Sequence, residues 1–162
     1  VKFYTASLWA ESVLKTYATG GESDRLYALL VDSLGELQRR PAAEAERVSI
    51  QFVWRFLEYS GMQPDLEYSA VSGEFLAEDE PVYYSAREQG FCAEDESSEE
   101  MPRWQPGAAA YLRYSGRQDL AAALRVVPPD GASARIKRVL YAILEEHVES
   151  PLNALRSGSG IL

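Results

Sequence analysis

The sequence predicts a mostly α-helical fold, a helical bundle interrupted by a small inserted β hairpin. Apolar residues recur every three or four positions over the first 60 residues and again near the end, which is typical of amphipathic helices. This period disappears in the middle of the chain, where short aromatic-rich segments alternate with Gly and Pro. With 162 residues, 46% of them hydrophobic and 25% charged, the chain is expected to form one globular domain.

The first three helices are expected over residues 5–18, 23–40 and 43–60. Thr5 is the expected N-cap of the first helix. The second carries four leucines at helical spacing and a wider apolar face, which predicts a central, well-buried helix; these residues are Leu26, Leu30, Leu34 and Leu37, with Tyr27 and Val31. The third has a stripe of Val48, Phe52, Phe56 and Tyr59. It should end at Gly61, because glycine accepts the left-handed C′ conformation at little cost.

Short strands and turns are expected over residues 66–95, followed by a charged loop at 94–100. Helices should resume at 108–114, 118–126 and 133–149, the last with a complete apolar stripe that includes His147. We therefore predict a helical part (1–65), an insert with an acidic loop (66–100), and a second helical part that completes the same domain (101–162).

Charge is distributed very unevenly along the chain, whose net charge is -9. Residues 65–100 hold twelve acidic side chains and one arginine, whereas residues 101–138 hold seven basic and two acidic side chains. The acidic total argues against strong phosphate binding by this chain, since phosphate neutralisation dominates nucleic-acid affinity. The basic segment is the place where an acidic partner is expected.

No catalytic apparatus is recognisable, and no cofactor is predicted. Cys92 and His147 are the sole candidates for a nucleophile–base pair, but such a pair requires a third orienting group. His147 is expected to be a packed core histidine. One cysteine allows no intrachain disulfide, which fits a reducing cytoplasm. No apolar run has the length of a membrane span.

The most informative spacing lies in the insert, where Ser69-x-x-Ser72-Gly73 is followed by Cys92-x-x-Asp95. With cysteine at Ser69, Ser72 and Asp95, this would be the paired C-x-x-C pattern of a zinc ribbon. Serine is not a usual zinc ligand, and structural sites normally have four ligands. We therefore interpret the insert as a degenerate, zinc-ribbon-like hairpin without metal. Its small core should contain Tyr68, Phe75, Tyr83, Tyr84 and Phe91.

Three further segments carry a resemblance to a known family. They are FVWRFLEYSGMQPDL at 52–66, WQPGA at 104–108, and the closing helix from 136 to 155 with Glu146-His147 and Pro151-Leu152. The first and second of these segments enclose the two knuckles, Ser69–Gly73 and Cys92–Asp95. In order and spacing, the segments and the knuckles together resemble the C-terminal part of the bacterial recombination mediator RecO. Zinc-binding members of that family carry the knuckle cysteines, three of which are replaced here.

The resemblance implies a non-enzymatic factor of DNA repair and homologous recombination in the bacterial cytoplasm. It implies an N-terminal OB-fold upstream of Val1 that makes most of the DNA contact. It also implies contacts of the helical part with RecR and with the C-terminal tail of single-stranded-DNA-binding protein. Two other classes stay open from the residues alone: a helical ligand-binding or adaptor module unrelated to DNA, and a small enzyme.

The basic segment offers candidate residues for docking an acidic peptide tail, which needs an apolar pocket and a basic rim. They are chosen from charge and helical position only: Arg113, Arg117, Lys137, Arg138 and Tyr141. The alternative interpretation is an ordinary solvated helix face.

Overall fold

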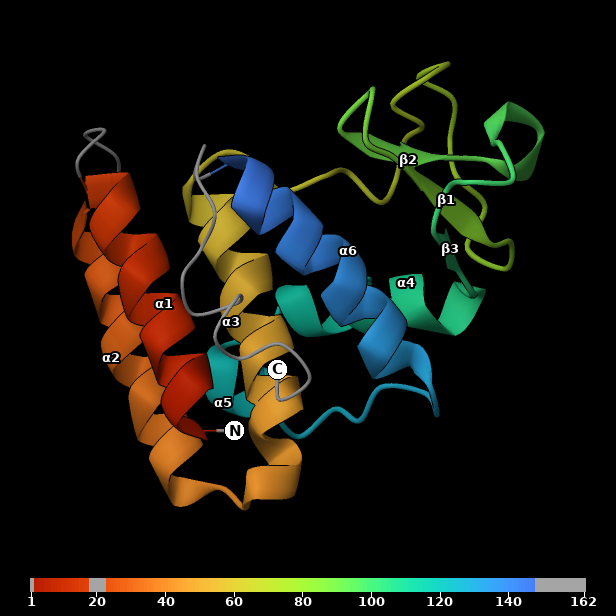
Figure 1. Cartoon of the computed structure of the whole chain (residues 1–162). Coiled ribbons are helices and arrows are strands. Elements are labelled where there is room, and N and C mark those ends of the chain that lie inside the picture. The colour runs from red at the N-terminus through yellow and green to blue at the C-terminus, as the bar shows by residue number, and fades with distance from the viewer. Residues whose placement is uncertain (1, 18–22, 148–162) are drawn as a thin grey trace.

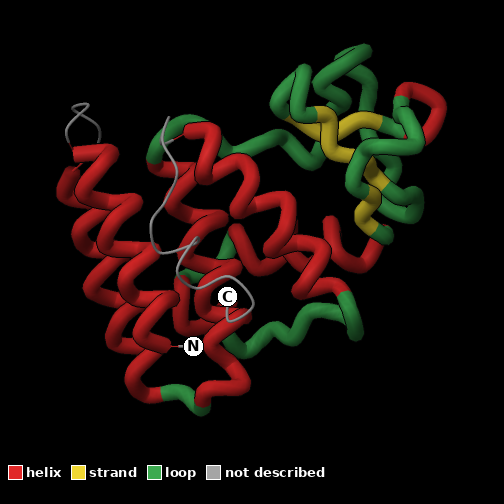
Figure 2. Tube along the Cα trace, viewed as in Figure 1, coloured by secondary structure: helices red, strands yellow, loops and turns green. Residues whose placement is uncertain are grey.

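The computed structural model describes residues 2–17 and 23–147, and it confirms the predicted fold class. The helices are α1 (Lys2–Tyr17), α2 (Ser23–Arg39), α3 (Ala45–Tyr59), α4 (Pro106–Gly116), α5 (Leu120–Ala123) and α6 (Ala132–His147), with short 3-10 turns η1 (Ala42–Glu44) and η2 (Glu94–Glu96). The strands are β1 (Val82–Ser85), β2 (Gly90–Cys92) and β3 (Arg103–Trp104). Figures 1 and 2 show the helices gathered in one body and the strands in a smaller lobe beside it.

Helix α3 is the centre of the helical body and contacts α1, α2, α4 and α6. In its predicted apolar stripe, Val48, Phe52 and Phe56 are fully buried and Tyr59 is partly buried. Trp9 of α1 stacks on Phe52, with ring centroids 4.7 Å apart, and Phe52 stacks in turn on Phe56 at 5.9 Å. Gly61 follows the helix with a φ of +71°, so its predicted role as the C′ residue is confirmed.

Helix α1 begins earlier than predicted. Thr5 does not cap it but lies inside the helix, 2% exposed. The first turn is tied to the end of α2, because the Lys2 ammonium donates hydrogen bonds to the Gln38 and Arg40 carbonyls at 3.3 and 2.6 Å. A cation at this position also interacts favourably with the C-terminal end of the α2 dipole.

Helix α2 is peripheral, so the prediction of a central, well-buried helix was wrong. Tyr27 and Val31 are 60% and 49% exposed, and Leu34 is also exposed. Of the predicted leucine stripe, Leu26 and Leu37 are buried and Leu30 is partly buried. Leu29 and Ser33 complete the buried face. A helix that is apolar on more than one face does not reveal from its own sequence which face its neighbours cover.

The insert forms a three-stranded antiparallel sheet together with β3, which lies just beyond its predicted end at residue 100. The strand order is β2-β1-β3, with Tyr84 opposite Phe91 and Val82 opposite Trp104. The rings of Phe91 and Trp104 lie 4.5 Å apart in its core. Strand β3 was not predicted. It brings Trp104 into this core, and the indole Nε1 donates to the Arg135 carbonyl of α6 at 3.2 Å.

Two of the five predicted core aromatics of the insert are on its surface. Tyr68 is 51% exposed and Phe75 is 62% exposed, although the two rings contact each other. They form an isolated antiparallel bridge outside the sheet, so they have no second layer to cover them. Tyr83, Tyr84 and Phe91 are buried as predicted.

The two helices that follow the insert differ in length from the prediction, and α4 is longer than the predicted 108–114. Helix α5 has four residues and is capped by Asp119, whose carboxylate accepts from the Ala122 N–H at 2.8 Å, so the predicted helix 118–126 is too long. The apolar stripe of α6 is confirmed through Ile136, Val139 and Leu140. In the described part of the chain, no helix has the length and apolar character that crossing a membrane requires.

Candidate functional site

The segment that resembles a zinc knuckle is closed by hydrogen bonds. Ser69 is 5% exposed, and its Oγ accepts from the N–H groups of Val71 and Ser72 at 3.1 and 3.3 Å. The same hydroxyl donates to the Glu96 Oε2 atom at 2.6 Å. The Ser69 carbonyl accepts from the Gly73 N–H, and Gly73 takes a φ of +75° that favours glycine. The turn is thus formed around a hydroxyl.

Glu96 is the residue that closes the knuckle from the other side. Its Oε2 atom accepts from both the Ser69 hydroxyl and the Ala93 N–H, the latter at 2.9 Å. Hydrogen bonds from Ser69, and then from Ser72 and Ala93, lower the pKa of the Glu96 carboxyl. A carboxylate that accepts several hydrogen bonds is stabilised in its charged form. The sequence spacing had pointed to Asp95 and missed this residue.

The four predicted knuckle positions do not converge on a metal. Ser69 and Ser72 are engaged with Glu96, whereas the Asp95 side chain is exposed. The Cys92 thiol faces the Tyr83 carbonyl at 3.5 Å and the Met101 sulfur at 3.9 Å. Among the residues that the structure describes, no group of three or more His, Cys, Asp or Glu side chains is arranged to hold a metal ion. The residues therefore do not fit the zinc of the resemblance.

Cys92 and His147 have separate environments. Cys92 is buried in β2, and burial raises the pKa of its thiol, which keeps it in the weakly nucleophilic protonated form. His147 lies at the end of α6, where its ring meets Phe56 edge-on with centroids 6.1 Å apart. The histidine therefore packs against the core residue Phe56, as expected from its place on the apolar stripe.

Arg113 and Arg117 lie together at a pocket of about 380 Å³ between α3, α4 and the loop that leads into the insert. The lining residues are Trp54, Glu58, Gln63, Pro64, Asp65, Leu66, Glu67, Leu112, Arg113, Gly116 and Arg117. Arg113 donates to the Leu66 carbonyl through Nε at 3.1 Å and through its second guanidinium nitrogen at 2.5 Å. Arg117 is 70% exposed and forms an ion pair with Glu67 at 2.5 Å.

The close packing of this pocket depends on a glycine. A Cβ atom at Gly116 would come within 2.7 Å of the Trp54 indole nitrogen, so the last turn of α4 can approach α3 only without a side chain there. Gly116 is the last residue of α4, two residues beyond the predicted end of this helix. The next residue of α3, Arg55, is 4% exposed and donates to the Ser115 and Gln118 carbonyls at 3.1 and 2.7 Å.

The other three candidates lie elsewhere. Lys137 forms an ion pair with Glu46 in the first turn of α3 at 2.9 Å, whereas Glu58 of the pocket lies twelve residues further along the same helix, about 18 Å away at 1.5 Å per residue. Arg138 is exposed. The Tyr141 hydroxyl shares a 2.7 Å hydrogen bond with Ser49, and burial raises its pKa to about 12. Tyr141 therefore points into the body.

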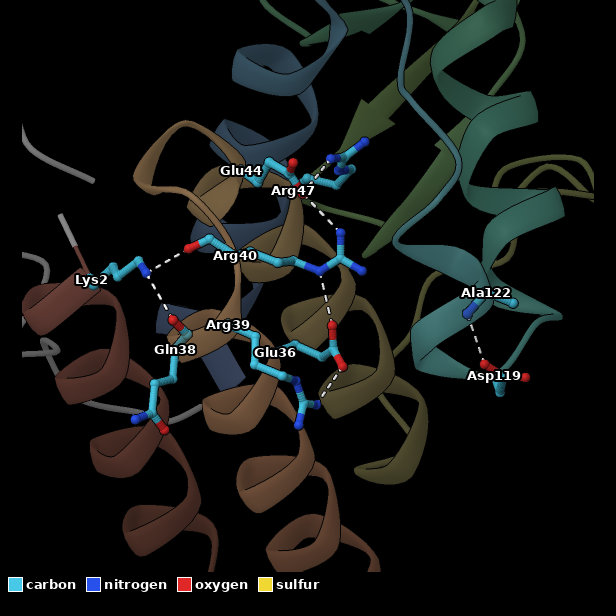
Figure 3. A network of polar contacts seen from close by, with 9 residues as sticks. All are labelled: Lys2, Glu36, Gln38, Arg39, Arg40, Glu44, Arg47, Asp119 and Ala122. Carbon is cyan, nitrogen blue, oxygen red and sulfur yellow. Dashed lines mark hydrogen bonds and ion pairs between the residues drawn. The ribbon is translucent and has the colours of Figure 1, made fainter.

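A second group of charged residues joins the end of α2 to the start of α3 (Figure 3). Arg40 forms ion pairs with Glu36 and Glu44 at 2.9 and 2.8 Å. Arg39 also pairs with Glu36, at 2.6 Å, and Arg47 also pairs with Glu44, at 2.7 Å. Hydrogen bonds from Arg39 and then Arg40 lower the pKa of Glu36, and one from Arg40 lowers that of Glu44. Because these charges pair with one another, we assign this cluster a structural role.

The comparison with known protein families decides the identity of the chain. The family described as "Recombination protein O C terminal" matches residues 1–156. The chain belongs to this family. No curated protein and no solved structure matches the sequence. Membership in the recombination protein O family places the chain in DNA repair and recombination.

Two features of the site were not predicted from the sequence. The role of Glu96 was not predicted, because the C-x-x-C spacing assigns the fourth ligand position to residue 95. The Glu96 carboxylate nevertheless reaches the Ser69 hydroxyl from the neighbouring position. The contribution of Trp54 and Glu67 to the pocket was hidden because the two residues come from separate elements. The only available signal was the pair Arg113 and Arg117, four residues apart and so on one helix face.

Proposed function

We propose that this chain is the C-terminal helical domain of a non-enzymatic recombination mediator that acts in the bacterial cytoplasm at the nucleoid. Its proposed partners are RecR and the C-terminal tail of single-stranded-DNA-binding protein. DNA is contacted mainly by an OB-fold barrel that precedes this domain in the family. The observation that carries the proposal is the family match over residues 1–156.

The pocket of Arg113 and Arg117 is the proposed docking site for the acidic tail. Such a tail, closed by an apolar residue and a free carboxylate, needs an apolar floor and a cationic rim. Trp54, Leu112 and Pro64 supply apolar lining. Arg113 has guanidinium N–H groups to spare beyond those donated to Leu66, because arginine carries five donors.

Glu67 occupies part of this site in the free domain. Its carboxylate pairs with Arg117 in the way that a carboxylate of the tail would. The pair is exposed at 70% and 48% and costs little to break, since exposed ion pairs contribute about 0 to 1 kcal/mol. An incoming tail therefore replaces the Glu67 carboxylate at Arg117 with one of its own. Its net gain comes from contacts between its terminal apolar side chain and the apolar lining of the pocket.

A fluorescent acidic peptide that ends in Phe and a free carboxylate tests this site. Arg117→Glu should weaken its binding about tenfold, because the reversal removes an exposed ion pair with the tail and adds a like-charge repulsion. Arg138→Glu is the matched control, an equal charge reversal at an exposed arginine outside the pocket, and should change affinity less than twofold. Glu67→Gln should tighten binding, because it removes the internal competitor.

Other outcomes decide against the site. Equal weakening by Arg117→Glu and Arg138→Glu would mean non-specific attraction. Weakening by the double reversal of Lys137 and Arg138, with Arg117→Glu silent, would move the site to α6. A peptide with an amidated C-terminus should bind less well than the free acid, and equal affinity would remove the carboxylate from the recognition.

The isolated chain should bind single-stranded DNA weakly, since its net charge is -9. Residual affinity should come from the basic segment and fall steeply with salt. A dissociation constant in the low nanomolar range at physiological salt, measured by fluorescence anisotropy with a labelled oligonucleotide, would show that this domain is itself a main DNA-binding element.

A further inference from the structure

The outer surface of the insert carries three apolar side chains that nothing in the described structure covers. Tyr68 and Val71 are each 51% exposed and Phe75 is 62% exposed. We call these three residues the aromatic tip. Contiguous exposed apolar groups on a folded domain are characteristic of interaction sites, whereas scattered single residues are not. Two of the three are in direct ring contact, which makes this a patch.

The aromatic tip has a fixed shape. Tyr68 and Phe75 face each other in an antiparallel bridge, with ring centroids 6.0 Å apart and the rings nearly perpendicular at 78°. The turn between them is held by the Ser69 network and by the Ala70 N–H, which donates to the Phe91 carbonyl of β2 at 2.8 Å. A surface that is already ordered loses little conformational entropy when a partner binds.

The chemistry around the tip selects the partner. The segment 65–100 holds twelve acidic side chains and one arginine. Glu74, Glu78, Asp79 and Glu80 are exposed and, within the described residues, make no ion pair. A strongly negative field of this kind repels nucleic-acid phosphates and attracts cationic groups. Aromatic rings likewise attract cations over their faces, arginine most of all.

We propose that the aromatic tip docks an arginine-rich segment of a partner protein. In this arrangement a guanidinium stacks on Tyr68 or Phe75, and the surrounding carboxylates pair with neighbouring basic side chains. Arginine is favoured over lysine because its planar guanidinium stacks on aromatic rings, whereas a lysine ammonium acts as a compact, strongly hydrated charge. The carboxylates supply long-range attraction, and the two rings supply the preference for arginine.

This surface is independent of the pocket proposed above. The pocket lining ends at Glu67, and none of the three tip residues belongs to it. The two sites also call for partners of opposite charge. Loss of acidic-peptide binding at Arg117 would therefore leave this inference untouched, and the reverse also holds.

The test uses two fluorescein-labelled probes, an arginine octapeptide and a lysine octapeptide, titrated against the whole chain at 150 mM salt. The wild-type chain should prefer the arginine probe. The double variant Tyr68→Ala, Phe75→Ala should lose about fivefold in affinity for arginine and almost nothing for lysine, since cation–π contacts at exposed sites contribute modestly. Phe3→Ala is the matched control, because Phe3 is an exposed aromatic on α1 (76%) away from the insert.

A second measurement separates the rings from the charges. Neutralising Glu78, Asp79 and Glu80 together should weaken both probes equally and leave the preference for arginine intact. Because all the substituted side chains are exposed, each variant should keep the wild-type thermal midpoint, and circular dichroism checks this. If wild type and the ring variant bind both probes alike, or if the arginine probe perturbs amide signals of α1 and not those of residues 67–76, the proposal is wrong.

Discussion

The helical body and the insert are stabilised by different interactions. The body packs around α3, whose eleven buried residues include two stacked phenylalanines, one of which stacks on Trp9. The insert has a few buried rings around Phe91 and is otherwise closed by polar contacts at Ser69 and Glu96. Apolar burial does not depend on pH, whereas a hydrogen bond to a carboxylate does. The two regions should therefore respond differently to the same perturbation.

The largest effect is expected in the body. Phe52→Ala removes a side chain that is fully buried between Trp9 and Phe56, and it should lower the free energy of unfolding by about 3–5 kcal/mol. Phe75→Ala, at a 62% exposed phenylalanine of the insert, should change it by less than about 0.5 kcal/mol. Urea denaturation of both variants measures the contrast. Similar losses would mean that the two regions do not differ in packing as described.

A smaller effect is expected where the knuckle meets the sheet. A Cβ atom at Gly90 would lie 2.5 Å from the Ala70 Cβ, so Gly90→Ala should destabilise the insert by about 1–3 kcal/mol through overpacking. Adding Ala70→Gly should restore much of the loss, because it removes the colliding atom. Gly35→Ala in α2 meets its nearest atom, on the flexible Arg39 side chain, at 3.5 Å and should be neutral or stabilising. Hydrogen exchange at the amide of residue 70, which donates to the Phe91 carbonyl at 2.8 Å, checks the series.

Much of this contrast was readable from the sequence, but not all of it. The stripe on α6 was found because that helix has a single apolar face, so the period identifies the buried side. On α3 the predicted stripe is only part of the buried surface, because residues 48–57 are buried on every side of the helix. On α2 the sequence was ambiguous, because Tyr27, Val31 and Leu34 look as apolar as the residues that are buried. Which face is covered depends on α1 and α3, and this is a property of the tertiary structure.

The knuckle was predicted in outline but not in its contents. The spacing of Ser69, Ser72 and Cys92 located the turn and strand β2 correctly. It could not show that Glu96 reaches the serines, since this depends on the 3-10 turn η2 that places its carboxylate. Likewise, Arg113 and Arg117 were chosen from charge and helical position, but the loop that completes their pocket comes from another part of the chain.

The charge on Glu96 gives a third, moderate effect. Glu96→Gln should speed amide exchange at Ala93 roughly threefold to tenfold, because a neutral acceptor makes weaker hydrogen bonds. Glu100→Gln, at an exposed glutamate near η2, is the control and should leave exchange unchanged.

The same carboxylate predicts a pH dependence. Its pKa is lowered from the ordinary 4.5, so its stabilisation is complete above about pH 4.5 and is lost as the pH falls through the lowered pKa. Exchange in the insert, followed by NMR, should accelerate in that acidic range in the wild type and change less in Glu96→Gln. The body has its own acid-sensitive pairs at Glu36 and Glu44, so the difference between the two proteins is the quantity to measure.

The smallest effect is expected from removal of metal. True zinc knuckles gain folding free energy from the ion, so a chelator unfolds them. Here EDTA should leave the thermal midpoint unchanged within error, and elemental analysis after dialysis should find no stoichiometric zinc. A midpoint that falls on addition of EDTA would mean that the hydrogen-bonded closure of Ser69 and Glu96 is not what holds the insert.

The closure of the knuckle also has a consequence for redox chemistry. Oxidation of zinc-binding thiolates releases the metal, and a fold that depends on the metal then unfolds. In this insert the closing groups are a serine hydroxyl, a carboxylate and main-chain amides, which peroxide does not oxidise. The Cys92 thiol is buried with a raised pKa, which leaves little thiolate to react. The hydrogen bonds that close this turn should therefore survive a peroxide treatment that would oxidise the thiolates of a zinc knuckle.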